Sequence, residues 1–464
     1  MDSRVENYLK SLKGKRIALL GIGRSNLPLV SLFSRYGAFI TVCDKKEKSA
    51  FSKEIIDEII SNGAAIKCGE DYLENLEVDI IFRAPGMYFN LPVLQEFREK
   101  DVVVTSEMEV FFDICPCKIF AITGTDGKTT TTTITTLILE KSGKKIYKGG
   151  NIGTPLLPKI EEMSADDICV VELSSFQLIS MRRSPDVAAV TNIYPDHLNV
   201  HKDMAEYIGA KVNILAHQNA FSRAVLNYDN EEAKALSKYV RGQLRYFSHL
   251  EKLEKGAYLD ENGWLVYSDG EKIEKIVHKD DIKIPGMHNV ENFLTAIALL
   301  YGEVKASDIA EVAKTFGGVE HRIEFVRELD GVRYYNDSIA TSPASVSAGL
   351  MAFNKKVIII AGGSDKQLDY STLSGNIIKF VKVLILIGET AEKIEKAVLE
   401  DSTYDENEIK IIRAESLEKA VLIARESAKE GDVVSLSPAS ASFDKYKDFE
   451  ERGRHFKKLI EELK

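Results

Sequence analysis

The chain reads Lys118-Ile-Phe-Ala-Ile-Thr123 and then Gly124-Thr-Asp-Gly-Lys-Thr129, an apolar run that leads directly into a glycine-containing loop. The β-branched run predicts a buried strand, and the residues after the loop predict a helix. Glycine lets backbone N–H groups close around phosphate oxygens, and a helix N-terminus adds positive potential. Lys128 would neutralise phosphate charge, and the Thr129 hydroxyl would reach Mg²⁺. Because the strict consensus has glycine where Ile122 stands, we predict a variant phosphate-binding loop, with a plain strand-to-helix turn as the alternative.

Five consecutive threonines, Thr129 to Thr133, begin at the end of this loop. Successive β-branched residues are unfavourable inside a helix. In the first turn of a helix, however, their hydroxyl groups can cap free N–H groups or reach a ligand. Their position after the loop therefore indicates a role at the start of the helix.

Short β-branched runs alternate with longer helical stretches along the whole chain, which is typical of parallel sheets covered by helices. The length of 464 residues fits two or three domains of ordinary size. We expect an α/β protein of three domains: a Rossmann-like domain over 1–105, a P-loop domain with a mostly parallel sheet over 106–317, and a second Rossmann-like domain over 318–464. The expected strands cover residues 16–20, 39–43, 78–82, 118–123, 168–172, 188–191, 224–226, 332–335, 356–361, 383–387 and 433–435.

The composition is that of an ordinary folded protein, with 44% hydrophobic and 28% charged residues. The net charge of −10 has the wrong sign for a general binder of nucleic acid or anionic lipid, so we expect small ligands. The first residues contain no apolar signal-peptide core, and no stretch approaches the ~20 apolar residues of a membrane span. We therefore expect a cytoplasmic protein without membrane insertion.

The five cysteines are scattered through the sequence, which is typical of reduced thiols. Cys115-Pro-Cys117 is the only close pair. A Cys-x-Cys unit without a second cluster of cysteine or histidine is a weak metal signal, so the sequence favours a structural or incidental role.

A second glycine turn, Gly21-Ile-Gly-Arg-Ser-Asn26, follows the first expected strand, and Asp44 closes the next one. This spacing is typical of a dinucleotide-binding dehydrogenase, in which the acid contacts the ribose. Asn26, however, stands in place of the third glycine. The turn is therefore expected to bind part of a nucleotide other than NAD, with a purely structural glycine turn as the alternative.

The middle of the chain supplies candidate metal and phosphate ligands on separate segments. Glu172 ends an expected strand, Asp196-His197 follows another, and Lys211 lies in a helical stretch. A carboxylate at a strand end near a phosphate loop can hold Mg²⁺, and a histidine can complete a second site. Taken singly, His197 and Lys211 are more often ordinary surface residues, so it is their joint occurrence that indicates a site.

A set of motifs in this order resembles the Mur ligases of peptidoglycan synthesis. The motifs are the loop at 124–129, Glu172-Leu-Ser-Ser-Phe-Gln177, Asp196-His197, His288-Asn289, His321-Arg322, Asn336-Asp337-Ser338 and Ser437-Pro-Ala-Ser-Ala-Ser-Phe-Asp444. The resemblance extends from the Gly21 turn to Arg452-Gly453. The motifs at 172–177 and 437–444 resemble those of the branch that adds D-glutamate to UDP-N-acetylmuramoyl-L-alanine.

The resemblance implies an ATP-dependent ligase that works through an acyl phosphate. ATP phosphorylates the substrate carboxylate, and the amine of D-glutamate then displaces phosphate. Such chemistry needs the charge on the transferring phosphoryl oxygens neutralised and both substrates held in line. The resemblance also implies two Mg²⁺ sites and a monomeric protein whose partners are UDP-N-acetylmuramoyl-L-alanine and D-glutamate.

The resemblance further implies roles for individual residues. It gives catalytic roles to Lys128, His197, Lys211 and Arg322. It places ATP at Gly124, Thr125, Asp126, Gly127, Lys128, Thr129, Thr130, Asn289, Asn292, Arg322 and Asp337. It places the metal at Thr129, Glu172, His197 and Lys211, the last carbamylated so that a cation becomes a carboxylate. It places the UDP-sugar at Gly23, Arg24, Ser25, Asp44 and Asn151, and D-glutamate at Thr341, Lys366, Ser442 and Phe449.

Two positions depart from the family pattern and bear on the substrate contacts. Ile339 stands where the family commonly has lysine, and Ala84 stands where serine is usual. A related ligase that adds another amino acid, or glutamate to folate, is the alternative within the superfamily. A dehydrogenase built on the first glycine turn is the alternative from another class, but it would leave the loop at 124–129 unexplained.

Overall fold

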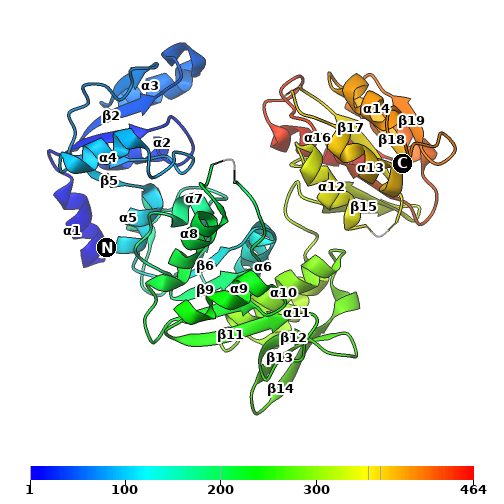
Figure 1. Ribbon diagram of the computed structural model, residues 1–464, viewed down its shortest axis with the longest axis horizontal. Helices are drawn as coiled ribbons and strands as arrows, with labels where there is room; N and C mark the ends of the chain where they lie inside the picture. The colour runs from blue at the N-terminus through cyan, green and yellow to red at the C-terminus, as the bar shows by residue number, and fades with distance from the viewer. Residues whose placement is uncertain (1, 199, 354, 366) are drawn as a thin grey trace. The chain divides into compact units, whose positions relative to one another are not determined.

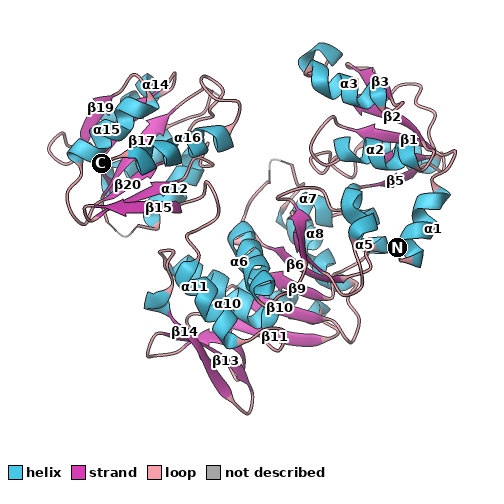
Figure 2. Cartoon of the chain, turned by 180° about the vertical axis from the view of Figure 1, so that it is seen from behind, coloured by secondary structure: helices cyan, strands magenta, loops and turns pink. Residues whose placement is uncertain are grey.

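The computed structural model describes the chain except for residues 1, 199, 354 and 366. In this described part, the strands form three sheets, and the chain divides into two compact units. One unit comprises residues 1–279 and 290–312, and the other comprises residues 280–289 and 313–464. Figure 1 follows the chain through these elements, and Figure 2 distinguishes helices from strands. The α/β class is confirmed, whereas the three-domain boundaries stay a prediction.

The first sheet of unit 1 is parallel and has the strand order β3-β2-β1-β4-β5. Its strands are β1 (Arg16–Leu20), β2 (Phe39–Asp44), β3 (Ala65–Cys68), β4 (Ile80–Phe82) and β5 (Val103–Thr105), and its helices are α1 (Ser3–Ser11), α2 (Leu27–Arg35), α3 (Lys53–Ser61) and α4 (Pro92–Glu99). Leu20 pairs with Cys43, so the turn after β1 and the end of β2 lie at the same edge of the sheet. This edge is where ligands bind in open parallel sheets.

The second sheet of unit 1 has the order β14-β13-β12-β11-β10-β9-β6-β8-β7. Its strands are β6 (Lys118–Thr123), β7 (Ile146–Gly150), β8 (Ile168–Glu172), β9 (Val187–Val190), β10 (Arg223–Asn227), β11 (Gln243–Ser248), β12 (Lys255–Leu259), β13 (Trp264–Asp269) and β14 (Ile273–His278). Strands β6 to β12 pair in parallel, as expected, whereas β12, β13 and β14 pair antiparallel. The antiparallel extension lies outside the strands predicted from the sequence.

The helices that accompany this second sheet connect its strands and carry several of the candidate residues. They are α5 (Glu107–Ile114), α6 (Lys128–Lys141), α7 (Ser175–Leu178), α8 (Met204–Ala216), α9 (Glu231–Ala235), α10 (Met287–Leu300) and α11 (Ala306–Thr315). β6 lies between β8 and β9, in the middle of the parallel strands, and it is buried from Ile119 to Thr123. The loop at 124–129 therefore emerges from a rigid, central strand.

The sheet of unit 2 has the order β15-β16-β20-β17-β18-β19, parallel except for the edge pair β15 and β16. Its strands are β15 (Glu324–Leu329), β16 (Val332–Asn336), β17 (Val357–Gly362), β18 (Val381–Ile387), β19 (Lys410–Arg413) and β20 (Val433–Leu436). Its helices are α12 (Pro343–Met351), α13 (Ser371–Phe380), α14 (Ala391–Leu399), α15 (Leu417–Ser427) and α16 (Phe449–Glu462). β17 and β20 are buried throughout and form the centre of the unit.

The predicted strands are present, with ends that differ by at most two residues. β18 begins two residues before its predicted start, and β4 begins at Ile80 although a strand was predicted from residue 78. Asp79 bonds to Arg16 through both its main chain and its side chain, with 2.8 Å from the Arg16 N–H to the carboxylate. This side-chain contact replaces ladder pairing at the start of the strand.

Candidate active site

The loop at 124–129 connects the end of β6 to the start of α6, as the sequence predicts. Gly127 has φ +79° and caps α6, whose first residue is Lys128. Gly124 has φ +152°, and a side chain there would meet the Thr191 hydroxyl 1.9 Å away. Both positions need glycine, one for its backbone conformation and the other for a close approach. The Lys128 ammonium donates to the Thr125 carbonyl at 2.6 Å, so the lysine lies back over the loop.

The segment after β9 holds this loop in shape. The Asn192 side chain accepts from the Asp126 N–H at 2.8 Å, and the Thr191 hydroxyl donates to the Asp126 carbonyl at 2.6 Å. The Asn192 carbonyl accepts from the Thr125 N–H at 2.9 Å. These bracing residues were missed in the sequence, although Asn192 lies only four residues before Asp196 at the same strand end. They fix the loop backbone before any ligand arrives, which lowers the entropic cost of binding.

Asn292 of α10 packs against the same loop from another direction. Its Oδ1 accepts from the Thr131 hydroxyl at 3.0 Å, and it would lie 2.5 Å from a Cβ placed on Gly127. The structure therefore brings Asn292 together with the phosphate loop, as expected of a nucleotide-binding residue. Asn289, on the same helix, donates to the Pro285 carbonyl at 2.6 Å and is assigned to unit 2.

Glu172 offers a carboxylate at the end of β8, beside the central strand β6. Its side chain is buried, and its Oε1 accepts from the Asn151 amide at 2.8 Å. Its Oε2 is also buried but has no hydrogen-bond partner among the described residues. A buried carboxylate oxygen without a partner is costly. The donor set therefore fits a cation, which would supply the missing partner.

Lys211 lies on α8 with its ammonium directed at the base of the phosphate loop. It is 1% exposed and donates to the Gly124 carbonyl at 2.7 Å and to the Thr123 hydroxyl at 3.4 Å. The Tyr207 ring lies beneath the ammonium at 4.7 Å. Burial, aided by the nearby Lys128, lowers the pKa of Lys211 to about 7. Near neutral pH, a large fraction of this lysine is therefore an uncharged amine.

His197 follows β9 and has the left-handed φ of +54°. Its ring lies 3.3 Å from the Asp196 carboxylate and packs at 5.1 Å against the Phe176 ring. The neighbouring His201 was missed in the sequence, yet its ring is buried. It stacks on Phe176 and makes contacts of 2.9 Å to the Ser175 hydroxyl and 3.2 Å to Glu206. The Phe176 ring thus joins the motif at 172–177 to the histidine segment.

A cavity of about 370 Å³ lies between the two sheets of unit 1. It brings together the residues predicted for the UDP-sugar: Gly23, Arg24, Ser25, Asp44 and Asn151. Asp44 accepts from the Ile22 N–H at 2.8 Å and so closes the glycine turn. Asn26 is buried and donates to the Leu20 carbonyl at 2.7 Å, which explains why it can replace a glycine without opening the turn. Ala84, the second departure from the family pattern, also lines this cavity.

Glu107 lines the same cavity and was not singled out in the sequence. Its Oε1 accepts from the backbone N–H groups of Leu156 and Leu157 at 2.9 and 2.8 Å. Burial raises the pKa of Glu107 to about 7, and the two N–H donors only partly oppose this rise. The nearby Arg83, almost fully buried, donates to the Ser180 hydroxyl at 2.6 Å and to the Phe176 carbonyl at 3.1 Å. Arg83 follows β4, so its bonds tie the first sheet to the segment after β8.

In unit 2, the predicted nucleotide residues Arg322 and Asp337 lie beside each other at the start of the sheet. Asp337 is buried and accepts from the Ile323 N–H at 3.2 Å. Burial raises the pKa of Asp337 to about 7 against the opposing effect of Arg322. The Arg322 side chain is exposed. Ile339, the first departure from the family pattern, donates its N–H to the His321 carbonyl at 3.1 Å.

Arg452 organises the segments that carry the predicted D-glutamate residues. Its buried guanidinium donates to Ser338, to the Ser440 carbonyl and to the Ala441 carbonyl at 2.9–3.2 Å. The Ser338 hydroxyl in turn donates to the carbonyl of Phe449 at 2.7 Å. Ser442 therefore directly follows an Arg452 anchor point, and Ser338 links Phe449 to the same network. Thr341 lies three residues after Ser338, whereas Lys366 lies outside the described residues.

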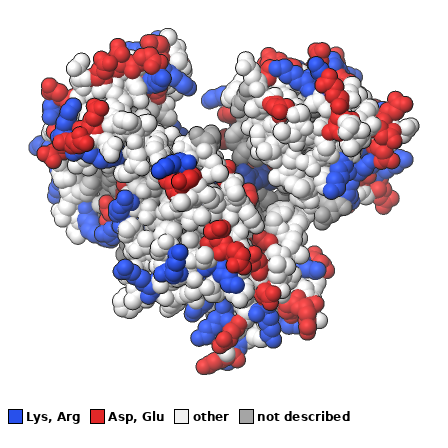
Figure 3. Space-filling view, viewed as in Figure 1, with Lys and Arg blue, Asp and Glu red and all other residues white. Residues whose placement is uncertain are grey.

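The described residues on the face of the molecule drawn in Figure 3 form no large patch of one charge. Acidic and basic side chains intermingle on the face drawn in Figure 3. None of the helices in the described part of the chain combines the length and apolar character needed to cross a membrane. The site features described above lie instead at strand ends and in a cavity, which is the usual position for binding small molecules in α/β proteins.

Comparison with known families and proteins gives matches along the full chain. Residues 122–300 match the Mur ligase middle domain, and residues 321–440 match the Mur ligase glutamate ligase domain. The UDP-N-acetylmuramoylalanine--D-glutamate ligase of Acetivibrio thermocellus is 50% identical over 467 residues, with both chains covered completely. The enzyme of the same name from Clostridium acetobutylicum is 45% identical over 467 residues, again with complete coverage of both chains.

Solved structures with the same fold are more distant in sequence. The UDP-N-acetylmuramate-alanine ligase of Thermotoga maritima superposes with a TM-score of 0.58 at 18% identity, covering 97% of this chain and 100% of that one. A pseudomurein peptide ligase type C from Methanothermus fervidus gives a TM-score of 0.54 at 18% identity, with the same coverage. These two structures support the fold.

Proposed function

The chain belongs to the Mur ligase family, and we propose from this that it joins D-glutamate to UDP-N-acetylmuramoyl-L-alanine in peptidoglycan precursor synthesis. ATP is cleaved to ADP and phosphate in the same reaction. The observation that carries the proposal is the braced loop at 124–129 next to the unpartnered carboxylate oxygen of Glu172. A loop of this kind holds phosphate oxygens, and the carboxylate is suited to the cation that accompanies them.

The reaction proceeds through an acyl phosphate. A carboxylate oxygen of the alanine attacks the γ-phosphorus of ATP, the bond to the bridging oxygen breaks, and ADP leaves. The amine of D-glutamate then attacks the activated carbonyl carbon, loses a proton, and expels phosphate to leave an amide. We assign Lys128 and the N–H groups of the loop to the ATP phosphates, because they surround the start of α6. The loop bracing by Thr191 and Asn192 keeps these donors in position.

Thr129, Glu172 and His197 are the residues that we propose to hold Mg²⁺. The fit rests on Glu172, whose buried Oε2 lacks a partner among the described residues. When bound, Mg²⁺ withdraws charge from the phosphoryl oxygens and so lowers the barrier to attack by an anionic carboxylate. His197 is half-exposed beside Asp196, so its ring can turn towards a ligand.

We propose that Lys211 is carbamylated. An uncharged amine can attack the carbon of CO₂, form an N–C bond and release one proton, whereas an ammonium cannot. The pKa of about 7 and the position at the base of the loop support this modification. The product carries a negative carboxylate, which suits a second cation site better than the positive charge that it replaces.

We propose separate sites for the UDP-sugar and for D-glutamate, one in each compact unit. The cavity lined by Gly23, Arg24, Ser25, Asp44 and Asn151 suits the UDP-sugar, because it offers backbone N–H groups of a glycine turn and an arginine. In unit 2, Arg322 and Asp337 are proposed for the nucleotide, and Thr341, Lys366, Ser442 and Phe449 for D-glutamate. Asn289 and Asn292 are proposed to lie at the adenine. We further propose a monomeric, cytoplasmic enzyme.

Transfer of ¹⁸O from substrate to phosphate tests this proposal. UDP-N-acetylmuramoyl-L-alanine with ¹⁸O in both carboxylate oxygens is incubated with ATP and D-glutamate, and the phosphate released is analysed by mass spectrometry. The mechanism predicts one ¹⁸O in each phosphate and one in each amide product. Phosphate without label, at a rate equal to amide formation, would show that the carboxylate is not phosphorylated.

A further inference from the structure

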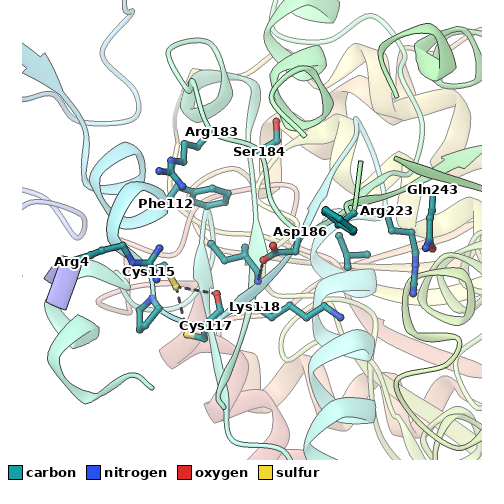
Figure 4. A pocket seen from close by; sticks show the side chains of 14 residues that line it. Arg4, Phe112, Cys115, Cys117, Lys118, Arg183, Ser184, Asp186, Arg223 and Gln243 are labelled. Atoms are coloured by element: carbon teal, nitrogen blue, oxygen red, sulfur yellow. Dashed lines mark hydrogen bonds between the residues drawn. The ribbon is translucent and has the colours of Figure 1, made fainter. Parts of the chain in front are cut away.

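A cluster of buried thiols lies at the opposite end of β6 from the phosphate loop. The Sγ atom of Cys117 lies 3.5 Å from that of Cys115 and 3.3 Å from that of Cys169, and the latter two are 3.8 Å apart. All three side chains are at most 6% exposed. Figure 4 shows Cys115 and Cys117 with their sulfurs turned towards each other. The cluster unites α5, the start of β6 and the buried strand β8.

The strand pairing explains why this cluster was not apparent from the sequence. Ile119 pairs with Cys169 in the register of β6 and β8, which brings residues 52 apart in the chain to the same place. The sequence favoured an incidental role for Cys115-Pro-Cys117 because no second cluster was visible nearby. Cys169 supplies the missing ligand through the tertiary structure.

The geometry suits one small ion held by three sulfurs. Three thiolates that each lie about 2.3 Å from a common ion form a triangle with edges of about 4 Å. The observed edges of 3.3–3.8 Å are all shorter than those of this triangle, so the sulfurs would move apart slightly to hold an ion. A disulfide would join two of the thiols and leave the third unbonded, and its formation would also need an oxidant. An ion uses all three.

The neighbouring groups indicate a soft ion of low coordination number. Among the described residues, the ligand atoms within 4.8 Å of one another come from these three cysteines, without a histidine or carboxylate. The nearest further donor is the thioether of Met163, whose Sδ lies 3.9 Å from the Cys169 sulfur. Thiolate and thioether sulfurs suit Cu⁺, zinc and iron–sulfur clusters. Structural zinc sites are almost always four-coordinate, so a set of three thiols favours Cu⁺.

A cavity beside the cluster provides access to the sulfurs and is lined by several basic side chains. Cys115 and Cys117 line this cavity of about 380 Å³, together with Arg4, Lys118, Arg183 and Arg223. Figure 4 shows these basic side chains around the cavity. Three thiolates around a monovalent ion carry a net charge of −2. The four basic groups lie near this charge, although each already pairs with a carboxylate of Asp2, Asp113 or Glu303. The cavity also gives an ion a route to the buried sulfurs.

We propose that Cys115, Cys117 and Cys169 bind one Cu⁺ ion. Each thiol loses its proton to solvent as its sulfur bonds to the ion, so no electron is transferred. Cys115 caps the end of α5, the helix that carries Glu107 into the UDP-sugar cavity, while Cys117 directly precedes β6 and Cys169 lies on β8 of the second sheet. The ion therefore acts as a structural clamp between α5 and the second sheet. This proposal is independent of the ligase reaction.

Titration of the reduced full-length chain with Cu⁺, under anaerobic conditions and in competition with a chromogenic cuprous chelator, tests the site. We expect one tightly held equivalent for the wild type and for Cys43→Ser, because Cys43 is equally buried but lies outside the cluster. We expect at least a tenfold weaker affinity for Cys117→Ser and for Cys169→Ser. The thermal midpoint should rise by several degrees with Cu⁺ in the wild type and not in these two variants.

Two results would overturn the proposal. One is wild-type protein that holds no stoichiometric Cu⁺, and the other is binding that survives loss of Cys117 or Cys169. A parallel titration with Zn²⁺ checks the choice of ion, because zinc bound in preference to Cu⁺ would refute the cuprous assignment. Should the serine variants fail to fold, X-ray absorption spectroscopy of the wild-type copper complex identifies the atoms that bind the ion. Three sulfurs at about 2.3 Å support the site, and a shell of nitrogen or oxygen refutes it.

Discussion

Replacing Glu107 by glutamine should stabilise the protein at alkaline pH and change little at pH 5. The side chain of Glu107 is buried, and its Oε1 accepts from the N–H groups of Leu156 and Leu157. Glutamine keeps an oxygen for these two donors, and its NH₂ group takes the place of the second oxygen beside the cavity. The substitution therefore removes the ionisation while preserving the contacts.

The expected magnitude follows from the pKa of Glu107. Burial raises it from 4.5 to about 7, so the folded chain keeps a proton that the unfolded chain has already released. The stability is complete below about pH 4.5, falls as the pH rises to about 7, and stays reduced above that. The loss amounts to roughly 3 kcal/mol, because each pKa unit corresponds to about 1.4 kcal/mol. Glutamine does not suffer this loss.

Calorimetry at pH 5 and pH 8.5 measures the effect, since it can resolve the separate transitions of a chain with two compact units. At pH 8.5, the unit that contains Glu107 should melt about 5 °C higher in Glu107→Gln than in the wild type. At pH 5, the two midpoints should nearly coincide. Glu109→Gln is the matched control, because it makes the same chemical change at a half-buried position of the same helix.

Equal midpoint differences at the two pH values would refute the reasoning, since a buried carboxyl with a raised pKa must give a pH-dependent difference. A variant that is less stable than the wild type at pH 8.5 would also refute it. In that case the ionised carboxylate would be the form that the two N–H donors stabilise.

Three further substitutions test the candidate site. Gly127→Ala places a Cβ 2.5 Å from Asn292 Oδ1, at a residue whose backbone is left-handed. We therefore expect the free energy of unfolding to fall by about 2–3 kcal/mol, and calorimetric titration to show roughly tenfold weaker ATP binding. Lys211→Ala should abolish ligation, and added formate or acetate should partly restore the rate of phosphate release; full activity without them would eliminate the carbamate. Asp337→Asn should raise the melting temperature of unit 2 at pH 8.5, since burial raises the pKa of Asp337 to about 7, while kcat/KM for ATP falls. A lower melting temperature at that pH would contradict the assignment.

Local sequence signals were sufficient for many of the parallel strands and for the phosphate loop, whereas the parallel strands β3, β5, β7, β11, β12 and β19 were not predicted. The run before Gly124 and the helix after it are consecutive in the chain, so composition and spacing alone predicted their order. The glycine turn at 21–26 was predicted in the same way, and Asp44 closes it through the Ile22 N–H. The hairpin strands β13 and β14 were missed as well. β14 begins with three exposed residues and so lacks a continuous buried run, whereas β13 has an apolar run at 264–267 that could have been recognised.

Residues that act through tertiary contacts could not be found from the sequence. Asn192 braces the loop only because β9 lies beside β6, and Arg452 joins Ser338 to Ala441 across more than a hundred residues. Glu107 differs from an ordinary surface glutamate because burial raises its pKa, and this burial depends on the tertiary structure. The roles of Arg322, Ser442 and the other assigned residues rest on the resemblance and stay predictions.

The most direct test of the central claim is the nucleophile dependence of phosphate release. Purified protein is given ATP, Mg²⁺ and UDP-N-acetylmuramoyl-L-alanine, and the phosphate released is measured with D-glutamate, L-glutamate, meso-diaminopimelate or L-lysine as the nucleophile. In a separate assay, folate replaces UDP-N-acetylmuramoyl-L-alanine as the acceptor and L-glutamate is the nucleophile. We expect rapid phosphate release with D-glutamate, accompanied by an equal amount of amide product, and a rate at least a hundredfold lower with the others. Preference for L-glutamate, for a diamino acid or for folate would contradict the central claim.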